Sequence, residues 1–390
     1  MLESAAQSKR EGKMKKKKKN SALFSSAFLL VLFCLIFSSH TAAQVEIKIE
    51  NGITVVRNPK TPAQVKGVPS LLTLKEDLVI GKETDKEDYW FSLLNSIAVD
   101  DSGNIYTLDP KEVRIRVFDS KGKLLRVFGR RGQGPGEFNG PGSINVRRDG
   151  NLVVNDFMKR KYSFLTSDGK SIKDVSTASF NLSRLRFDSR GFLYSINWIF
   201  GEKQGQEIAK FDQNMNRVAT ISSFKTETKP RVTIPFKNSH YFDLTSKDEL
   251  VWLISSKYEM NVVNPEGKLI KRIIKDYEPK KITNADRERI EKEESSGLPQ
   301  KITVELPQNF PPAEDLLIDD EDRIYVRTCD RDSKGGAFYD VFDSEGRYIS
   351  RFSLPEKERV LVIKKNKLYC IIQESKESIP LMKRYDMKWK

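Results

Sequence analysis

The sequence predicts an all-β fold: a six-bladed β-propeller of four-stranded antiparallel blades, with the ring closed by N-terminal strands that join the last blade. Three observations lead to this prediction. A unit of about 40 residues repeats along the chain. Runs in which β-branched and aromatic residues alternate with polar ones are bounded by Asp, Gly and Asn turns. Helical periodicity is nearly absent.

The repeat is clearest in two segments, "DLVIGKETDKEDYWFSLLNSIAVDDSGNIYTLD" at 77–109 and "LRVFGRRGQGPGEFNGPGSINVRRDGNLVVND" at 125–156. In both, a Ser lies in the first strand, a Gly follows in the turn, and an Asp closes the second strand. The matched positions are Ser96, Gly103 and Asp109 in the first segment and Ser143, Gly150 and Asp156 in the second.

The unit recurs so that we expect blades near 96–130, 143–178, 184–224, 241–275, 315–354 and 359–390. The last unit shows only three strands. "LLTLKEDLVIG" at 71–81 resembles the fourth strand "LLRVFG" of an earlier unit, and we expect it to complete the last blade and close the ring. "QVEIKIENGITVVRN" at 44–58 is a hairpin that turns at Asn51-Gly52, and we expect it to add to the same closing blade or to cover it.

The glycine-rich stretch "GRRGQGPGEFNGPGSI" at 129–144 is interpreted as a connector between two blades. A dinucleotide-binding loop must follow a strand and open a helix, whereas a strand and a turn, "SINVRRDGN", follow here. Glycines permit the tight backbone path that such a connector needs.

These segments closely resemble the bacterial six-bladed β-propeller proteins of the NHL-repeat type. The resemblance rests on "LTLKEDLVIG", "YWFSLLNSIAVDDSGNIYTLD" and "VFGRRGQGPGEF", and it covers residues 45 to 390. It implies the propeller fold but no particular activity, because NHL-like propellers include scaffolds, ligand binders and a few enzymes.

The N-terminus has a basic segment, an apolar run and then small residues, which together predict a secretory signal peptide over 1–43, with Met14 as an alternative start. Cleavage leaves one propeller domain, 44–390, that is periplasmic, in the cell envelope or secreted. An uncleaved segment would instead anchor it to the membrane. Residues 1–43 carry +6 of the net charge of +14, and the remaining charges are interspersed, so we expect no nucleic-acid partner.

The residues limit the chemistry. His240 is the one histidine after residue 43, which excludes a zinc site with two or more His ligands, and we expect it to be partly buried at a strand edge. Cys329 and Cys370 are expected to be buried free thiols. "IDDEDRIY" resembles a calcium loop but lacks the required glycine and glutamate, so turn chemistry explains it.

All the long segments fall on one predicted face of the ring, where second strands pass to third strands and one blade passes to the next. They are 82–89, 130–142, 197–205, 225–239, 276–312 and 330–336. The segment 276–312 includes "TNADRERIEKEESSGLP", which predicts one short surface helix that Thr283 or Asn284 caps and Gly297 ends. Function commonly lies on variable loops held by a rigid scaffold, so we assign the site to this face and the channel mouth.

The candidate binding residues on this face are Arg130, Arg131, Asp109, Asp156, Trp198 and Arg327. Aromatic and Arg side chains suit binding hot spots, and Trp can stack on a sugar. The first hypothesis is an exported, monomeric binding module, without a cofactor, for a protein, peptide or carbohydrate. The alternative is a metal-dependent hydrolase or lyase that uses carboxylates at the channel mouth, with Asp109 and Asp156 as the first pair to inspect.

Overall fold

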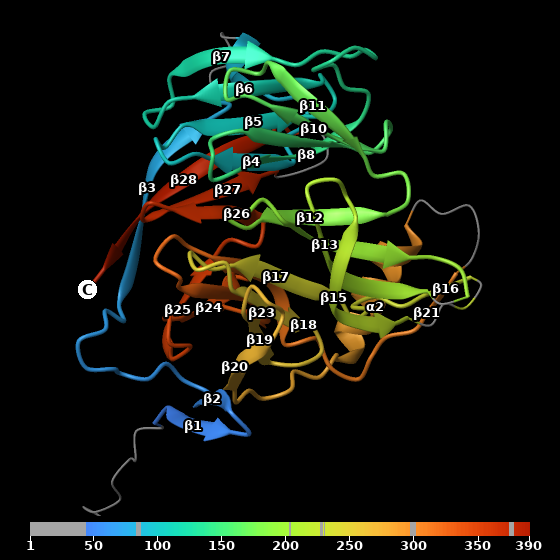
Figure 1. Cartoon of the computed structure of the whole chain (residues 1–390). Coiled ribbons are helices and arrows are strands. Elements are labelled where there is room, and N and C mark those ends of the chain that lie inside the picture. The colour runs from blue at the N-terminus through green and yellow to red at the C-terminus, as the bar shows by residue number, and fades with distance from the viewer. Residues whose placement is uncertain are drawn as a thin grey trace, which may run out of the picture. The chain divides into compact units, whose positions relative to one another are not determined.

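The strands of the chain form six blades around a ring, as Figure 1 shows. The computed structural model describes residues 44–82, 87–202, 204–226, 229, 231–296, 302–373 and 378–390. The predicted signal peptide and Met14 lie outside these residues. The six-bladed, four-stranded antiparallel propeller that the sequence predicts is confirmed.

Each blade runs outward from its first strand. Blade one is β4 (Ser96–Val99), β5 (Ile105–Asp109), β6 (Arg114–Phe118) and β7 (Leu124–Phe128), and blade two is β8 (Pro141–Val146), β9 (Leu152–Asp156), β10 (Lys161–Leu165) and β11 (Ser171–Ser176). Blade three is β12 (Leu182–Phe187), β13 (Leu193–Ile199), β14 (Gly205–Phe211) and β15 (Arg217–Lys225), and blade four contains β17 (His240–Leu244), β18 (Leu250–Ile254), β19 (Glu259–Val263) and β20 (Leu269–Lys275). Blade five is β22 (Ala313–Ile318), β23 (Ile324–Arg331), β24 (Ala337–Phe342) and β25 (Tyr348–Leu354), and blade six is β26 (Glu358–Lys364), β27 (Lys367–Ile372), β28 (Leu381–Trp389) and β3 (Leu72–Ile80).

The hydrophobic core lies between neighbouring blades. Leu108 and Ile115 of blade one belong to the same buried cluster as Leu152 and Val154 of blade two. Burying one such side chain contributes roughly 1.5–3 kcal/mol, so each blade is stabilised mainly by the blade beside it. Every blade therefore has both of its faces covered only when the ring is closed.

Strand β3 closes the ring, as expected. It pairs antiparallel with β28 from Leu72↔Trp389 to Ile80↔Met382. Figure 1 shows this pairing as the blue β3 beside the red β28. The outer edge of the last blade is thus covered by a strand from the start of the domain.

The N-terminal hairpin differs from the prediction. Its turn at Asn51-Gly52 is confirmed, with φ of 51° and 77°, and it joins β1 (Glu46–Glu50) to β2 (Ile53–Asn58). However, β2 pairs in parallel with β20 of blade four, so the assignment to the closing blade was wrong. The outer edge of blade six is already taken by β3, whereas β20 offers a free edge.

Residues 45–80 form a strap, the N-terminal strap, that follows the outside of three blades. In β2, Val56 is fully buried and Asn58 holds blade five, because its Oδ1 accepts from Tyr348 N at 2.7 Å. Farther along, Ala63 N donates to Tyr348 O at 2.8 Å. The strap then continues into β3 and blade six.

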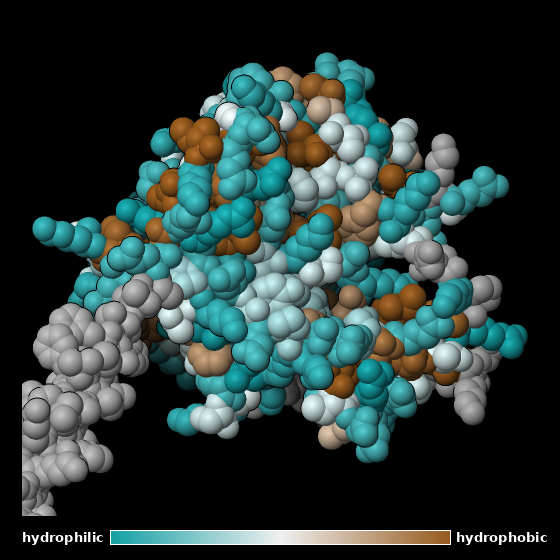
Figure 2. Space-filling view, turned by 90° about the horizontal axis from the view of Figure 1, so that it is seen from below, coloured by the Kyte–Doolittle hydropathy of each residue, from teal (hydrophilic) through white to brown (hydrophobic). Residues whose placement is uncertain are grey.

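The predicted surface helix is α2 (Asn284–Ser295), capped by Thr283 in a capping box with Asp286. The predicted stop at Gly297 lies outside the described residues. Short elements beside it are η1 (Glu87–Tyr89) and the two-stranded parallel sheet of β16 (Val232–Thr233) and β21 (Thr303–Val304). None of the helices described is long and apolar enough to cross a membrane. Figure 2 shows the view from below as mostly hydrophilic, with separate hydrophobic patches.

Candidate functional site

The six predicted site residues lie on or beside one face of the ring, but they do not line a common cavity of the described chain. We call this face the long-loop face; it comprises the described parts of 82–89, 130–142, 197–205, 225–239, 276–312 and 330–336. Each of these segments joins a second to a third strand or one blade to the next.

Asp109 and Asp156 hold the connectors that enter their own blades. Both are fully buried. Asp156 accepts hydrogen bonds from the backbone of Asn139 at 2.7 Å and of Gly140 at 3.0 Å. Asp109 accepts from Ser92 N at 2.7 Å in the same way. Their oxygens are therefore engaged by the fold, each in its own blade.

Arg130 and Arg131 stabilise the glycine-rich connector. The Arg130 side chain is 80% exposed, and its Nε donates to Glu137 Oε1 at 2.7 Å. Arg131 donates to the carbonyl oxygen of Asn139 at 3.1 Å. The loop closes over Phe138, which is fully buried, and a strand follows at Pro141. This confirms that the stretch is a connector.

Arg327 lies in an ion-pair network under helix α2, at a cavity of about 480 Å³. It pairs with Glu356 at 2.6 Å and with Glu314 at 3.3 Å, and Arg331 pairs with the same two carboxylates. Burial raises the pKa of Glu314, although Arg331 and Arg327 oppose that shift. The charges of this cavity thus largely satisfy one another.

Trp198 lies in a groove of about 280 Å³ between blades two and three, which we call the aromatic groove. Its lining includes Asn155, Phe157, Arg160, Asn181, Trp198 and Phe200. Three of the aromatic residues that line this groove are exposed: Phe157 (54%), Trp198 (40%) and Phe200 (65%). The indole Nε1 of Trp198 donates to Ser183 Oγ at 3.0 Å, so the polar atom of the ring is already paired.

Asn155 forms part of the buried lining of the aromatic groove. It is only 3% exposed, and its carboxamide makes no hydrogen bond with any described residue. Neither polar atom of the carboxamide is fully enclosed, so the amide faces the water of the groove and is available to a ligand. At the matching position, blades one, three and four carry Leu108, Ile196 and Leu253, whereas blade five carries Arg327. A polar residue at this position therefore occurs in two blades, and in both it lies on the long-loop face.

Two connector glycines provide space for the exposed aromatic turn of blade two. A Cβ on Gly142 would lie 1.9 Å from Phe157 Cε2, and a Cβ on Gly140 would lie 2.4 Å from Met158 Cγ. A larger residue at either position would displace the exposed side chain above it. These two glycines therefore help to set where Phe157 and Met158 lie, in addition to permitting the backbone path that the sequence suggested.

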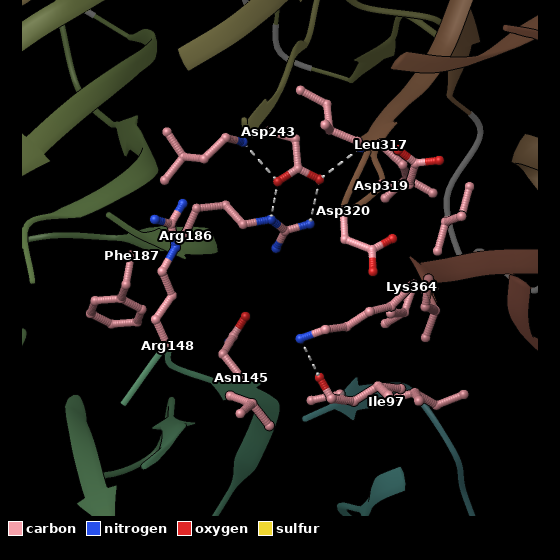
Figure 3. A pocket seen from close by; sticks show the side chains of 18 of the residues that line it. Ile97, Asn145, Arg148, Arg186, Phe187, Asp243, Leu317, Asp319, Asp320 and Lys364 are labelled. Carbon is pink, nitrogen blue, oxygen red and sulfur yellow. Dashed lines mark hydrogen bonds and ion pairs between the residues drawn. The ribbon is translucent and has the colours of Figure 1, made fainter. Parts of the chain in front are cut away.

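A further cavity, of about 430 Å³, lies in the central channel and is lined by the first strands of all six blades. We call it the channel cavity. Its lining reaches the turn residues Asp101, Arg148, Ser246 and Asp320, so it opens toward the face opposite the long loops. Figure 3 shows Asn145, Arg186 and Lys364 pointing toward its middle from different sides. None of the six predicted residues lines it.

The charges of the channel cavity mostly join neighbouring parts of the ring. Arg186 binds Asp243 of the next blade through two contacts of 2.5 and 3.2 Å, drawn as dashed lines in Figure 3. Lys364 pairs with Asp101 at 2.6 Å. Deeper in the channel, Arg184 crosses to blades four and five, where it donates to Phe242 O at 2.8 Å and to Asp315 at 2.6 Å.

Potential metal ligands do not cluster in the part of the chain that the structure describes: no three His, Cys, Asp or Glu residues are grouped to hold a metal ion. In the calcium-like loop, Asp319 accepts from the backbone of Glu321 and Arg323 at 2.9 Å, which confirms turn chemistry. His240 is more buried than expected, at 1% exposure, and burial lowers its pKa to about 4. Cys329 and Cys370 are buried free thiols, as expected.

Solved structures share the fold at low sequence identity. A Bacteroides fragilis protein described by its name as exported is 11% identical, with a TM-score of 0.53, and the match covers 86% of this chain and 99% of that chain. A DUF4221 family member from Bacteroides vulgatus is 12% identical, with a TM-score of 0.54 and coverage of 83% and 100%. The virginiamycin B lyase of Staphylococcus aureus is 10% identical, with a TM-score of 0.43 and coverage of 80% and 99%.

No curated protein matches the sequence. A family model, DUF5128, described as a 6-bladed beta-propeller, matches residues 79–305. This match spans more than half of the chain and includes blades one to four. It agrees with the blade topology. The chain therefore belongs to the DUF5128 family of six-bladed β-propellers.

Proposed function

We propose that this propeller is an exported binding module that holds its ligand in the aromatic groove of the long-loop face. One observation carries the proposal: three exposed aromatic side chains border a groove that the amide of Asn155 faces, open to water and without a hydrogen bond to any described residue. Concave sites that combine apolar surface with a few polar groups are typical of ligand binding. A ligand hydrogen bond to Asn155 would offset the cost of burying that amide.

Export is supported by two separate features. The N-terminus has the basic, apolar and small-residue order of a signal peptide. The Bacteroides fragilis propeller of the same fold is named as an exported protein. We therefore place the binding module outside the cytoplasm, in the periplasm, in the envelope or in the medium.

The channel cavity and the cavity beside α2 support binding less well. In the channel cavity, Arg186 and Lys364 already have carboxylate partners. In the cavity beside α2, Arg327 and Arg331 share Glu314 and Glu356. A ligand there would have to displace internal ion pairs, whereas the aromatic groove offers an unpaired amide and exposed rings.

The proposal is tested by a thermal-shift screen of peptides, oligosaccharides and small polar molecules. Two matched variants each remove one exposed aromatic side chain of the long-loop face: Trp198→Ala in the groove and Phe236→Ala outside it, with exposures of 40% and 38%. A ligand of the native state raises the unfolding midpoint by mass action. We expect ligands that stabilise the wild type and Phe236→Ala but not Trp198→Ala. Ligands that stabilise all three proteins equally would refute the groove as the site.

A further inference from the structure

We infer that the ligand of the aromatic groove is a neutral carbohydrate, bound through one or two sugar rings of a longer chain. This inference rests on the proposed function, which makes the groove the binding site. The groove volume of about 280 Å³ lies near the lower end of the roughly 300–1,000 Å³ of small-molecule sites, which suits a short part of a larger ligand.

The exposed rings provide stacking surfaces. Phe157 comes from the turn after β9, while Trp198 and Phe200 come from the end of β13 and the turn after it, so rings from two blades border one groove. Because Ser183 holds the indole Nε1 of Trp198, the exposed part of that ring offers apolar surface. A pyranose presents C–H groups on its faces, which match such a surface, and hydroxyls around its edge.

The unpaired amide matches those hydroxyls. The carboxamide of Asn155 has an oxygen that accepts and a nitrogen that donates two hydrogen bonds. Two adjacent sugar hydroxyls can satisfy both atoms at once, one as donor and the other as acceptor. Asn181, at the same groove, uses its Nδ2 to hold Trp198 O at 3.3 Å, which supports the platform beside Asn155.

The charge of the lining favours a neutral ligand. Arg160 is the only charged residue among the described residues that line the groove, and its guanidinium donates to Ala178 O. The channel cavity, by contrast, is lined by both acids and bases. A basic ligand would find no carboxylate in the lining and an acidic ligand only the exposed guanidinium of Arg160, so the nearly uncharged lining suits a ligand that is neutral over most of its surface.

The strands around the groove disfavour an extended peptide that adds to the sheet. Strands β9 and β13 are each paired on both sides, and β12, which also contributes to the groove, has one unpaired edge, the inner edge of its blade. Strand addition needs a free edge. A proline-rich peptide that docks on aromatic rings is the remaining peptide mode, and it becomes an outcome of the test.

The experiment is a glycan array probed with the purified protein, followed by calorimetric titration of the best neutral oligosaccharide and of a proline-rich peptide. The variants are Trp198→Ala, Asn155→Leu and the control Phe236→Ala, each checked for an intact unfolding transition. We expect oligosaccharide binding that Trp198→Ala and Asn155→Leu each weaken about tenfold or more, as for truncated hot spots, and that Phe236→Ala leaves unchanged.

The other outcomes separate the two proposals. Binding of the peptide but not of any neutral glycan, with loss in Trp198→Ala, would overturn the carbohydrate inference and keep the groove as the site. Glycan binding that survives in both groove variants would overturn both proposals, because the sugar would be bound elsewhere. Absence of glycan binding together with absence of any groove-dependent ligand in the thermal-shift screen would also overturn both.

Discussion

Replacing Asn155 with Leu should make the protein more stable while it removes the binding site. Leu has the same branching at Cγ as Asn but a larger volume, and the propeller already places Leu108 at the matching position of blade one, where it is fully buried. The substitution removes a buried carboxamide that has no partner among the described residues. Residues that lower stability in this way are commonly retained for function.

The expected gain follows from the burial of Asn155. Burying an unpaired amide costs roughly 1–3 kcal/mol, and contact of the groove with water reduces that cost. Because the amide of Asn155 faces the groove, we expect Asn155→Leu to raise the free energy of unfolding by at most about 1 kcal/mol. Urea unfolding followed by circular dichroism measures this change, and the m-value should stay constant if only the folded state is affected.

The matched control is the reverse change, Leu108→Asn. It creates an unpaired buried amide and loses the burial of a leucine side chain, so it should lower the free energy of unfolding by roughly 3–5 kcal/mol. If Asn155→Leu instead lowers the free energy of unfolding by about 1 kcal/mol or more, Asn155 has a structural role that its contacts do not show. The argument from its missing partner is then refuted.

Three further measurements test the fold and its ionisable groups. Asp156→Ala leaves three backbone N–H groups without their acceptor, so the free energy of unfolding measured in urea should fall by about 3 kcal/mol. Asp156→Asn should lose less. Equal stability of the wild type and both variants would contradict the role of Asp156 in holding the connector. Burial lowers the pKa of His240 from 6.5 to about 4, so on acidification the unfolded state takes up the proton first. The contribution of neutral His240 to the free energy of unfolding is therefore complete above pH 6.5 and falls by up to ~3 kcal/mol toward pH 4. His240→Gln should flatten this pH dependence of stability, and an unchanged slope would exclude His240 as its cause. Burial raises the pKa of Cys329 to about 11 and also raises that of Cys370, so a thiol reagent at pH 8 should modify neither until urea unfolds the chain, and rapid labelling of the native protein would disprove their burial.

The blades could be predicted from the sequence because their information is local. A hairpin such as "SINVRRDGNLVVND" contains its own strands, turn and register, so repetition of the pattern reveals the ring. The place of the N-terminal hairpin could not be predicted in this way. Its own residues specify β1 and β2, but the choice between β20 and blade six depends on which outer edge is free once β3 has docked.

The site was only partly predictable for a related reason. Trp198 was singled out as an aromatic residue on a long loop, and the structure places it in the groove. Phe157 was not, because its exposure depends on Gly142 beneath it, a contact between a turn and a connector. Asp109 and Asp156 were singled out because they occupy equal positions in the repeat. Each instead binds the backbone of a connector, so their shared position reflects a shared structural contact.

The N-terminal strap has a consequence for how the chain reaches its native state. A ribosome makes β1, β2 and β3 first, yet β2 pairs with β20 and β3 with β28, whose last residues lie more than 200 positions later in the sequence. Closing such long loops is slow, and early strands with open edges are prone to wrong pairings. Blades one to three can form from consecutive residues while β2 and β3 of the strap are still unpaired. We therefore expect the last folding step to be the pairing of β3 with β28, which joins the first strands synthesised to the last one. A chaperone that bound residues 45–80 during synthesis would protect the segment whose partners are made last.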